Sequence, residues 1–315
     1  MHTAMHTGRI ELCRPRFLVS AVRCAPSCDG AHAGAARRDC AFRVAWTINP
    51  HMVVGSADPE RATEQHLRFV RLLERLGAQV TTLPFVHGAF DSVFAKDNAV
   101  VVGDADGVRA LLGRARRDER RAERHGRARA LASLGVAIDP GGAEPLEGGD
   151  VQLLADGSAL LGHGFRSSSS AAVPLSRFLG APVVPLTLVD PRLYHLDMAV
   201  SVLRDGTALV CAEALAPASV DALARHPQVR DVVAVPLAEA LAFGVNLVEV
   251  GDAVVTGADC PRIAEALRAR GRTVHVTPLG EFQRAGGSAA CLVAPVYRPR
   301  ARTHSATAAI RSTAA

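Results

Sequence analysis

A turn signal that recurs about every fifty residues is the feature that most restricts how this chain can fold. Apolar, β-branched runs flank each turn, and the turn pairs are Asp106-Gly107, Asp156-Gly157, Asp205-Gly206 and Gly251-Asp252. Glycine adopts positive φ without steric cost, so an acid-glycine pair between two such runs predicts a β-hairpin. A repeat of this length predicts similar supersecondary units side by side, with equivalent positions on one rim of the molecule.

Polar residues precede the first three turns at a nearly constant distance. Asp97, Glu147 and His195 stand nine or ten residues before them. Because equivalent positions of repeated units share a rim, we expect two acids and a histidine to meet at one end of the molecule. That arrangement is typical of an active site.

Helices and strands are predicted to alternate along the chain. Residues 57–76 carry an apolar residue about every 3.6 positions, and Gly77 follows them, which predicts an amphipathic helix. Strands are predicted at 17–22 and 80–85, and short helices near 131–132 and at 170–179, 217–225 and 260–270. Strand–strand–helix–strand units in series predict an α/β fold whose units close on themselves.

The repeat continues from about residue 85 to residue 295 without an internal linker rich in Pro and Ser. We therefore expect residues 17–296 to form a single catalytic domain. Residues 1–16 and residues 297–315, which are rich in Arg, Ser, Thr and Ala, are expected to be disordered. The apolar runs are too short to span a membrane or to form a signal peptide, so we expect a cytoplasmic protein without a membrane partner.

Basic residues are concentrated in one segment of the chain. The net charge is +5, and eight arginines lie between Arg114 and Arg129. Such a run could bind nucleic acid. Interleaved acids and the absence of aromatic residues for base stacking favour a solvated helix with i,i+4 charge pairs, and no nucleic-acid partner.

The cysteine content favours a reducing compartment. There are seven cysteines, an odd number at irregular spacing, which does not suit a disulfide framework. Four possible zinc ligands occur near the N-terminus, namely Cys24, Cys28, His32 and Cys40. Because their spacing matches no common zinc finger, we expect neither a metal ion nor a cofactor.

Groups able to do chemistry occur in short motifs. Asp91 and Asp97 bracket DSVFAKD, Glu147 and Asp150 bracket EGGD, His195 and Asp197 flank Leu196, and Cys291 follows AGGSAA. On a strand, His195 and Asp197 would point to the same face. A lone cysteine before an apolar run is usually a core residue, as we expect for Cys211 and Cys260. For Cys291, the joint register of the repeats favours a catalytic role instead.

A thiol, an imidazole and several carboxylates on one rim suit an electrophile that is itself a cation. Two carboxylates can hold a guanidinium group by bidentate, charge-assisted hydrogen bonds. A thiolate can then attack the guanidinium carbon while His195 protonates the departing nitrogen. The residues by themselves therefore indicate a guanidino substrate.

These motifs are similar to the signatures of a known superfamily. DSVFAKD, EGGDVQLL, the segment 194–197 and AGGSAACL resemble, in this order, those of the guanidine-modifying enzymes. That group includes dimethylarginine dimethylaminohydrolases, arginine deiminases and glycine amidinotransferases. The resemblance runs from about Phe17 to Val296 and implies a five-bladed α/β propeller. FRVAWTINPHM is similar to the start of a bacterial branch and would place Asn49 near the substrate entrance.

The resemblance also implies roles for individual residues. Cys291 would be the nucleophile and His195 the general acid and base. Glu147 would orient His195 and the guanidinium, and Asp97 would grip the guanidinium nitrogens. Arg166, and less securely Arg120, match arginines that hold the substrate α-carboxylate. The motifs themselves, without the resemblance, make Asp91 and Asp150 further candidate substrate-binding residues.

Two residues depart from the pattern of the dimethylarginine hydrolases. Asp197 stands where those enzymes commonly have Lys, and Lys96 stands where they carry an acid. A second carboxylate would pair with the NH₂ end of an unmethylated guanidinium, whereas methyl groups would leave it buried and unpaired. Asp197 therefore favours arginine or a simple derivative.

We expect a cofactor-free C–N hydrolase that acts on a small guanidino compound through a covalent thiouronium-type intermediate. An amidinotransferase could pass the same adduct to an amine, and a dimethylargininase would take the methylated substrate. A catalytically silent propeller that acts as a binding protein is a third alternative. The joint presence of Cys291, His195, Glu147 and Asp97 disfavours it. A homo-oligomer is compatible with the sequence.

Overall fold

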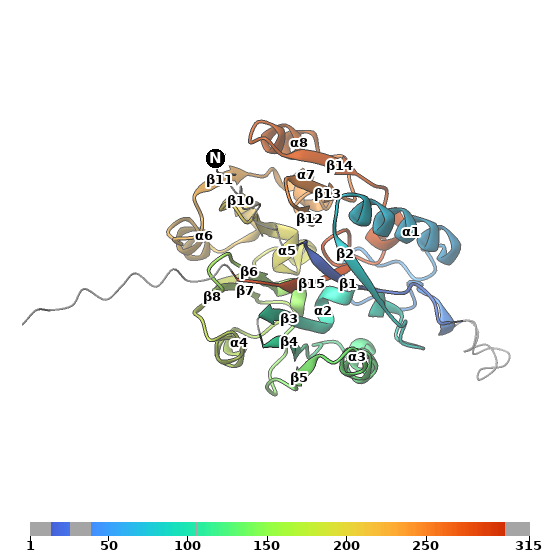
Figure 1. Cartoon of the computed structure of the whole chain (residues 1–315). Coiled ribbons are helices and arrows are strands. Elements are labelled where there is room, and N and C mark those ends of the chain that lie inside the picture. Colours follow the sequence, from blue (N-terminus) through green and yellow to red (C-terminus); the bar gives the residue numbers. More distant parts are fainter. Residues whose placement is uncertain (1–13, 26–38, 105, 300–315) are drawn as a thin grey trace, which may run out of the picture.

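The computed structural model describes residues 14–25, 39–104 and 106–299. In these residues one sheet has six strands in the order β2-β1-β15-β3-β4-β5. Three further sheets have the orders β6-β7-β8, β9-β10-β11 and β12-β13-β14. Because β15 pairs with β3, two three-stranded blades join into the larger sheet, and the fold has five blades in all. The predicted five-bladed α/β propeller is confirmed (Figure 1).

The blades have the following strands: β3 (Ala99–Asp104), β4 (Gly107–Leu112) and β5 (Ala137–Asp139); β6 (Val151–Leu153), β7 (Ala159–His163) and β8 (Val183–Thr187); β9 (Val200–Val202), β10 (Thr207–Val210) and β11 (Asp231–Ala234); β12 (Leu247–Val250), β13 (Ala253–Thr256) and β14 (Thr273–Val276); β15 (Val293–Tyr297), β1 (Arg16–Ser20) and β2 (Gln79–Leu83). The first two strands of each blade are antiparallel, and the third is parallel to the second. Every blade is therefore a ββαβ unit.

One helix in each blade crosses from its second strand to its third, as a parallel pair requires. These helices are α3 (Arg121–Ser133), α4 (Ala172–Leu179), α6 (Pro217–Ala224), α8 (Pro261–Arg268) and α1 (Pro59–Arg75). All five lie at the outside of the ring of blades (Figure 1). The helix predicted at 57–76 is α1, which starts at the Asp58 cap and buries Phe69 and Leu73.

Shorter helical segments connect the blades. They are α2 (Ala95–Asn98), α5 (Leu196–Ala199), α7 (Leu237–Leu241) and α9 (Gly280–Gln283), with 3₁₀ turns η3 (Phe90–Val93), η4 (Asp118–Arg120), η5 (Gly148–Asp150), η6 (Ser169–Ala171), η7 (Pro191–Leu193) and η8 (Ala212–Ala214). Several of these segments end where the first strand of a blade begins. These segments therefore position the side chains that lie at the centre of the ring.

The two ends of the described chain complete one blade together. Strand β1 pairs antiparallel with β15, with Phe17 opposite Pro295 and Val19 opposite Val293. This pairing closes the ring without an open seam between the first and last units. Ordered strands begin at Arg16 and end at Tyr297, one residue beyond each predicted boundary. Of the two predicted disordered ends, residues 1–13 and 300–315 lie outside the described residues.

The hairpin turns agree with the turn chemistry read from the sequence. Gly107, Gly157, Gly206 and Gly251 all have positive φ. The carboxylates of Asp156 and Asp205 each accept a hydrogen bond from the backbone two residues later, which holds the turn. Four apolar clusters then pack the blades together; one of them joins Val100 of β3 to Leu161 of β7 and Leu175 of α4.

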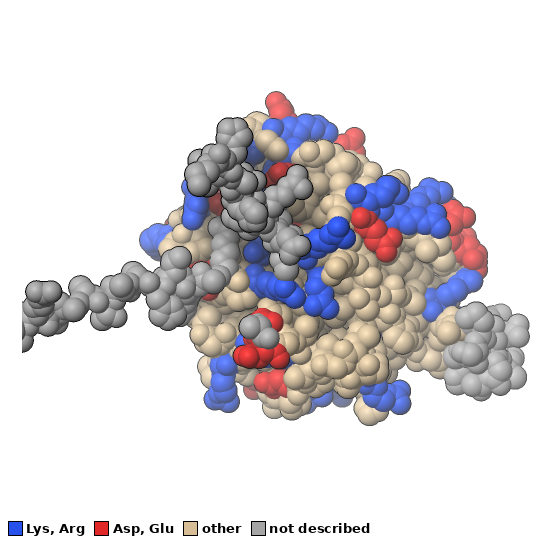
Figure 2. All heavy atoms as spheres, in the orientation of Figure 1, with Lys and Arg blue, Asp and Glu red and all other residues tan. Residues whose placement is uncertain are grey.

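The Arg-rich segment differs from the expected solvated helix. Helix α3 buries Glu123 and Arg127, and Arg120 just before it is also buried. Arg127 donates to Asn98, Ser20 and two carbonyl groups, so part of this segment holds blades together. On the face shown in Figure 2, basic side chains form separate groups with acidic side chains beside many of them.

Among the described helices, none is long and apolar enough to cross a bilayer.

Candidate active site

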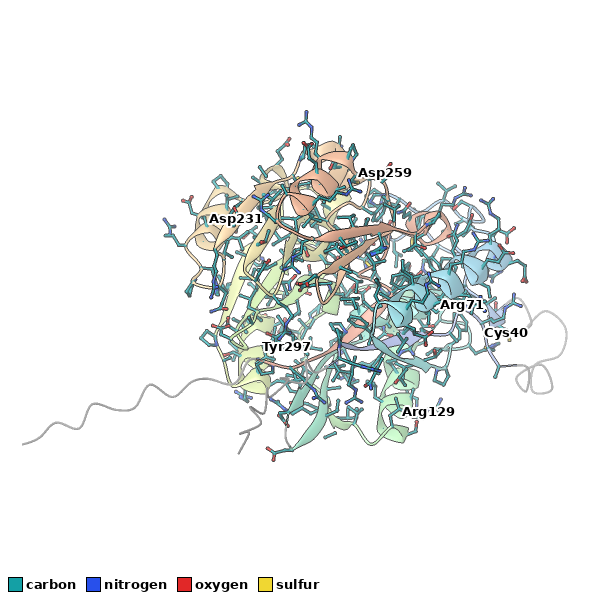
Figure 3. All side chains as sticks on the ribbon, turned by 45° about the horizontal axis from the view of Figure 1, so that its top comes forward. Cys40, Arg71, Arg129, Asp231, Asp259 and Tyr297 are labelled. Atoms are coloured by element: carbon teal, nitrogen blue, oxygen red, sulfur yellow. The ribbon has the colours of Figure 1, made fainter. Side chains whose placement is uncertain are left out.

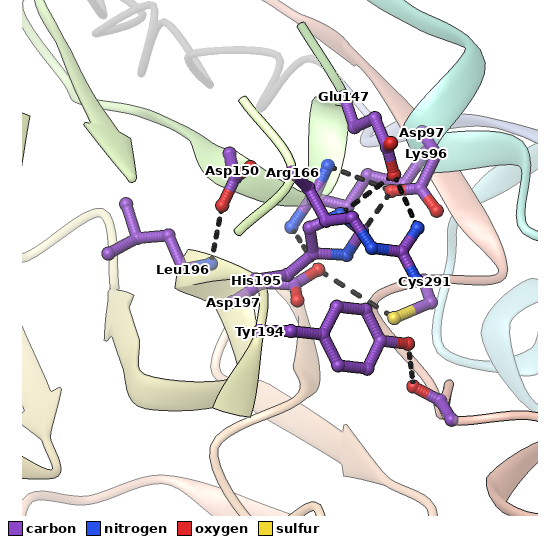
Figure 4. Close-up of polar contacts among 12 residues, drawn as sticks. Lys96, Asp97, Glu147, Asp150, Arg166, Tyr194, His195, Leu196, Asp197 and Cys291 are labelled. Atoms are coloured by element: carbon purple, nitrogen blue, oxygen red, sulfur yellow. Dashed lines mark hydrogen bonds and ion pairs between the residues drawn. The ribbon is translucent and has the colours of Figure 1, made fainter. Parts of the chain in front are cut away.

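Each blade places one polar residue just before its first strand. These residues are Asp97 before β3, Glu147 before β6, Asp197 before β9, Asn246 before β12 and Cys291 before β15. All are buried, and the close-up in Figure 4 shows most of them directed toward a common centre. Asp97, Glu147 and Cys291 are three of the predicted residues, and in the third blade Asp197 takes the place expected for His195, which lies two residues earlier.

Cys291 is held by backbone and side-chain contacts before β15. Its Sγ atom accepts a hydrogen bond from Nδ2 of Asn246 at 3.2 Å, and Oδ1 of Asn246 accepts from the Cys291 amide at 3.3 Å. Sγ also lies 3.8 Å from Oδ2 of Asp197. Burial, followed by the charges of Asp197 and Asp97, raises the pKa of the Cys291 thiol well above its usual range. The thiol is therefore protonated in this state at neutral pH.

Lys96 is the partner of Asp197. Its Nζ atom donates to Oδ2 of Asp197 at 2.9 Å, while Oδ1 of Asp197 is buried without a hydrogen-bond partner in the described structure. Burial opposes the charge of Lys96, but the Asp197 carboxylate outweighs burial and raises the pKa of Lys96. One oxygen of the Asp197 carboxylate thus has no hydrogen-bond partner among the described residues, while the other meets Lys96 and Cys291.

His195 lies between two carboxylates. Nε2 lies 3.0 Å from Oε2 of Glu147, and Nδ1 lies 3.7 Å from Oδ1 of Asp97. Burial disfavours the imidazolium, but Asp97, Asp150 and Glu147 outweigh it and raise the pKa of His195 to about 9. At neutral pH the ring is therefore an imidazolium that can donate a proton.

The expected strand through His195 and Asp197 is wrong. His195 caps the four-residue helix α5, and Asp197 lies in the first turn of that helix. The helical turn separates their directions. His195 meets Glu147, whereas Asp197 meets Lys96 and Cys291.

Glu147 is surrounded by donors. Its carboxylate accepts from Arg166 Nη1 at 3.2 Å, from the Arg116 amide at 3.0 Å and from His195. Burial would raise the pKa of Glu147, but the charges of Arg166, His195 and Arg120 lower it well below its usual range. Glu147 is therefore an anion that orients His195 and stabilises its charge.

The two predicted carboxylate-binding arginines are committed to protein acceptors. Arg166 donates to Glu147 and to the Ile48 carbonyl, and its guanidinium lies over the ring of Tyr194 at 4.6 Å. Arg120 differs more from its predicted role. It is buried, and it donates to Glu123, to Asp97 at 2.7 Å and to a backbone carbonyl. Arg120 therefore neutralises acids of the site, and its guanidinium nitrogens already have protein acceptors.

The other predicted acids also have internal partners. Asp97 accepts from Arg120 and from the Gly149 amide at 3.0 Å, so both of its oxygens are engaged. Asp150 accepts from the amides of Ser167 and Leu196 and ties two blades together. Asp150 thus holds α5 in place, and both of its oxygens accept backbone hydrogen bonds.

Asp91 keeps one oxygen available. Oδ2 accepts from Nε1 of Trp46 at 2.8 Å, and Oδ1 is buried without a partner in the described part of the chain. Burial raises the pKa of Asp91 to about 7.

Asn49, predicted at the substrate entrance, donates to the Ala285 carbonyl and to the hydroxyl of Tyr194.

The second glycine of EGGD, Gly149, is required at its position for a steric reason. A Cβ atom on Gly149 would lie 2.6 Å from Nδ1 of His195 and 2.7 Å from Oδ1 of Asp97. Such contacts are closer than van der Waals distance, so only glycine lets the imidazole and the carboxylate approach this turn.

Asn246 was not predicted from the sequence. It begins the fourth apolar run, NLVEV, at the position equivalent to Glu147 and Asp197, so the repeat itself contained the signal. Trp46, which donates to Asp91, had no signal in the repeat because it precedes the repeated region.

Among the residues that the structure describes, two groups of side chains have metal-ligand spacing. Ligand atoms of Asp97, Glu147 and His195 lie within 4.8 Å of one another. Arg120 and Arg166 already neutralise these carboxylates, so the group does not need a cation. The second group comprises Cys24, Cys40 and His87. Of the sequence-based zinc candidates, Cys28 and His32 lie outside the described residues.

Comparisons with known proteins agree with the fold. A family model described as N,N dimethylarginine dimethylhydrolase, eukaryotic, matches residues 55–298. The N(G),N(G)-dimethylarginine dimethylaminohydrolase of Mycobacterium tuberculosis is 33% identical over 259 residues, covering 81% of this chain and 83% of the relative. The bifunctional arginine dihydrolase/ornithine cyclodeaminase AgrE of Nostoc sp. is 30% identical over 263 residues, covering 82% of this chain and 37% of AgrE. Among solved structures, the product-bound N-terminal domain of ArgZ, a cyanobacterial arginine dihydrolase, superimposes with a TM-score of 0.79 at 26% identity, covering 91% of this chain and 99% of that domain.

Proposed function

The chain belongs to the dimethylarginine dimethylaminohydrolase family, and from this premise we propose that it hydrolyses a C–N bond in the guanidino group of arginine or an arginine derivative. One observation carries the assignment. Cys291 lies beside Asp197, which has an unpartnered oxygen, in a site that also holds an imidazolium bound to Glu147. A thiol, a proton donor and a free carboxylate oxygen are the groups that a guanidinium substrate needs.

The substrate cation itself helps to activate the nucleophile. In the free site, burial and the charges of Asp197 and Asp97 oppose loss of the Cys291 proton. A guanidinium bound next to Asp197 places a positive charge beside Sγ. That charge favours the thiolate, because an opposite charge within a few ångströms stabilises the charged form. Activation is thereby coupled to substrate binding.

The reaction follows from these positions. The Cys291 thiolate attacks the guanidinium carbon, and His195 donates its proton to the nitrogen that leaves as ammonia or an amine. Water then attacks the carbon of the covalent amidino-cysteine adduct while His195, now neutral, removes a proton from the water. The C–S bond breaks, which releases the ureido product and regenerates the Cys291 thiolate. Glu147 stabilises the imidazolium at both stages, and Asn246 donates to the sulfur. The relatives named above are hydrolases, which favours water over an amine as the acceptor.

We assign unmethylated arginine as the preferred substrate. Oδ1 of Asp197 can accept one N–H of the guanidinium, and a methyl group on that nitrogen would leave the oxygen buried and unpaired. The curated relatives include enzymes named for each substrate, dimethylarginine and arginine. Binding of the α-carboxylate by Arg166 would require Arg166 to share its guanidinium with Glu147.

The cysteine content supports a reducing compartment such as the cytoplasm.

A substrate panel tests the proposal. The purified chain is incubated with arginine, monomethylarginine, asymmetric dimethylarginine and agmatine, and the products scored are ammonia, methylamines, citrulline and ornithine. Release of ammonia and citrulline from arginine is expected, with none from the Cys291→Ser variant. Turnover that depends on an added amine would make the chain a transferase, and efficient turnover of agmatine would show that no arginine recognises the α-carboxylate.

A further inference from the structure

Two cysteines and a histidine from three separate chain segments meet outside the candidate active site. Nδ1 of His87 lies 3.4 Å from Sγ of Cys40 and 4.0 Å from Sγ of Cys24, and the three atoms all lie within 4.8 Å of one another. Figure 3 shows Cys40 at the periphery of the molecule. We propose that Cys24, Cys40 and His87 bind a Zn²⁺ ion.

The spacing of the three atoms matches tetrahedral zinc. With Zn–S bonds of about 2.3 Å and Zn–N bonds of about 2.0 Å, a tetrahedral ion separates a sulfur from a nitrogen ligand by about 3.6 Å. The two S···N distances of 3.4 and 4.0 Å bracket that value. Small rotations of the side chains would therefore be enough to bring all three atoms onto one ion.

Backbone hydrogen bonds hold the three segments in place. The Cys24 amide donates to the Cys40 carbonyl at 2.7 Å, and the Phe42 amide donates to the Val22 carbonyl at 2.8 Å. These bonds form a short antiparallel ladder that sets the two cysteines opposite each other. The Gly88 amide donates to the Asp39 carbonyl at 3.0 Å, which brings His87 to the same point. The ligands are thus positioned by the fold before an ion binds.

The donor set selects the kind of metal. Two thiolates and one imidazole suit borderline or soft ions such as Zn²⁺, whereas Mg²⁺ and Ca²⁺ prefer oxygen ligands. The described residues thus supply three of the four ligands that a tetrahedral zinc ion takes. Binding converts both thiols to thiolates and releases their protons, so zinc affinity should rise with pH.

The ion would fasten a loop that leads into the active site. From Cys40 the chain runs to Phe42, whose ring stacks on Phe282, and to Trp46, which donates to Asp91. His87 begins the loop that carries Asp91 itself. Zinc would therefore join the two segments that position Trp46 and Asp91, and its role would be structural.

Metal analysis of the full chain tests this site independently of the proposed reaction. The chain is purified anaerobically with zinc in the growth medium and dialysed against metal-free buffer, and zinc is measured by mass spectrometry. We expect about one zinc per chain. Cobalt substitution should produce a sulfur-to-cobalt charge-transfer band and tetrahedral d–d bands, because Co²⁺ reports the ligands that silent Zn²⁺ hides. A strong chelator should lower Tm by about 5 °C or more, since an ion that binds only the folded state stabilises it.

Variants locate the ion. Cys24→Ser, Cys40→Ser and His87→Gln should each lose most of the zinc, while Cys291→Ser and the core variant Cys211→Ser should keep it. Loss of zinc in Cys291→Ser alone would place the ion in the active site and overturn the proposal. Absence of zinc from the native chain together with a Cys24–Cys40 disulfide in peptide mapping would also overturn it. If a ligand variant fails to fold, the cobalt spectrum of the native chain still decides, because a spectrum without thiolate bands contradicts the assignment.

Discussion

Sγ of Cys291 lies 3.8 Å from Oδ2 of Asp197, the same oxygen that accepts a hydrogen bond from Nζ of Lys96 at 2.9 Å. The candidate nucleophile therefore sits beside an ion pair, and the two charges of that pair act on its pKa in opposite directions. The lysine that departs from the expected motif belongs to the electrostatic control of the thiol.

The first prediction concerns the nucleophile. Cys291→Ser should abolish turnover, because a serine hydroxyl is not ionised at neutral pH and lacks the nucleophilicity of a thiolate. Substrate should still bind, as measured by calorimetry. In the native chain a haloacetamidine should label Cys291 in preference to Cys211 and Cys260, because Asp197 beside Cys291 has an unpartnered carboxylate oxygen that can bind the cationic reagent. Full activity of the serine variant would exclude covalent catalysis by this residue.

Lys96 is expected to control the reactivity of Cys291. In Lys96→Gln the Asp197 charge is no longer compensated, so the pKa of Cys291 should rise further. Alkylation of Cys291 by iodoacetamide at fixed pH should slow by about ten-fold, equivalent to a rise of about one pKa unit. Lys96→Arg keeps the positive charge and should restore most of the rate. An unchanged alkylation rate in Lys96→Gln would show that the ion pair does not act on the thiol.

Asn246 should matter to the chemical step more than to substrate binding. Asn246→Ala removes the donor to Sγ and the acceptor for the amides of Ala290 and Cys291. A hydrogen bond to a charged group contributes about 1.5–3 kcal/mol, so kcat should fall about ten- to hundred-fold. KM should change little, and circular dichroism should show the native fold. A rise in KM with unchanged kcat would contradict this role.

The pH dependence follows from the protonation states of Cys291 and His195. The thiol of the free protein is protonated at neutral pH. Burial lowers the pKa of His195, but nearby carboxylates outweigh burial and raise that pKa to about 9. Forming the thiolate beside an imidazolium below that pH releases one proton. The logarithm of kcat/KM should therefore rise with pH at a slope of about one, and level off near pH 9.

Above pH 9 His195 has already lost its proton, and the reactive pair forms by transfer of the Cys291 proton to His195 without net release. Asp97→Asn removes a charge that raises the pKa of His195, so the point of levelling should move to lower pH. A profile that is flat between pH 7 and 9 would mean that the thiolate–imidazolium pair exists before substrate binds.

Substrate preference should depend on Asp197. Each methyl group removes a guanidinium N–H and leaves a buried carboxylate oxygen without a partner, at a cost of about 2–3 kcal/mol. Arginine should therefore exceed asymmetric dimethylarginine in kcat/KM by at least about ten-fold. Asp197→Ala should narrow that ratio by harming arginine more. Preference of the native chain for the dimethylated substrate would assign it to the dimethylargininases.

Much of the fold could be predicted from local sequence because the signals are local. An Asp-Gly pair needs only its own backbone to turn, and Gly107, Gly157 and Gly206 do so with positive φ. Helix α1 has its cap, its apolar period and its terminating glycine in one segment. The error at His195 and Asp197 arose because a two-residue spacing was interpreted as a strand, whereas contacts with neighbouring blades stabilise the short helix α5.

By itself the sequence determined the repeat, the turns and the grouping of Asp97, Glu147 and His195 at the same end of their units, because neighbouring residues encode the period and the turn chemistry. Only the tertiary structure decided which charges meet. The pairs Lys96–Asp197 and Arg120–Asp97, the contact of Asn246 with Cys291, and the approach of His87 to Cys24 and Cys40 each join residues from different blades or loops. The distances between such residues depend on how the blades pack and on closure of the ring by β1 and β15, and no local pattern encodes them.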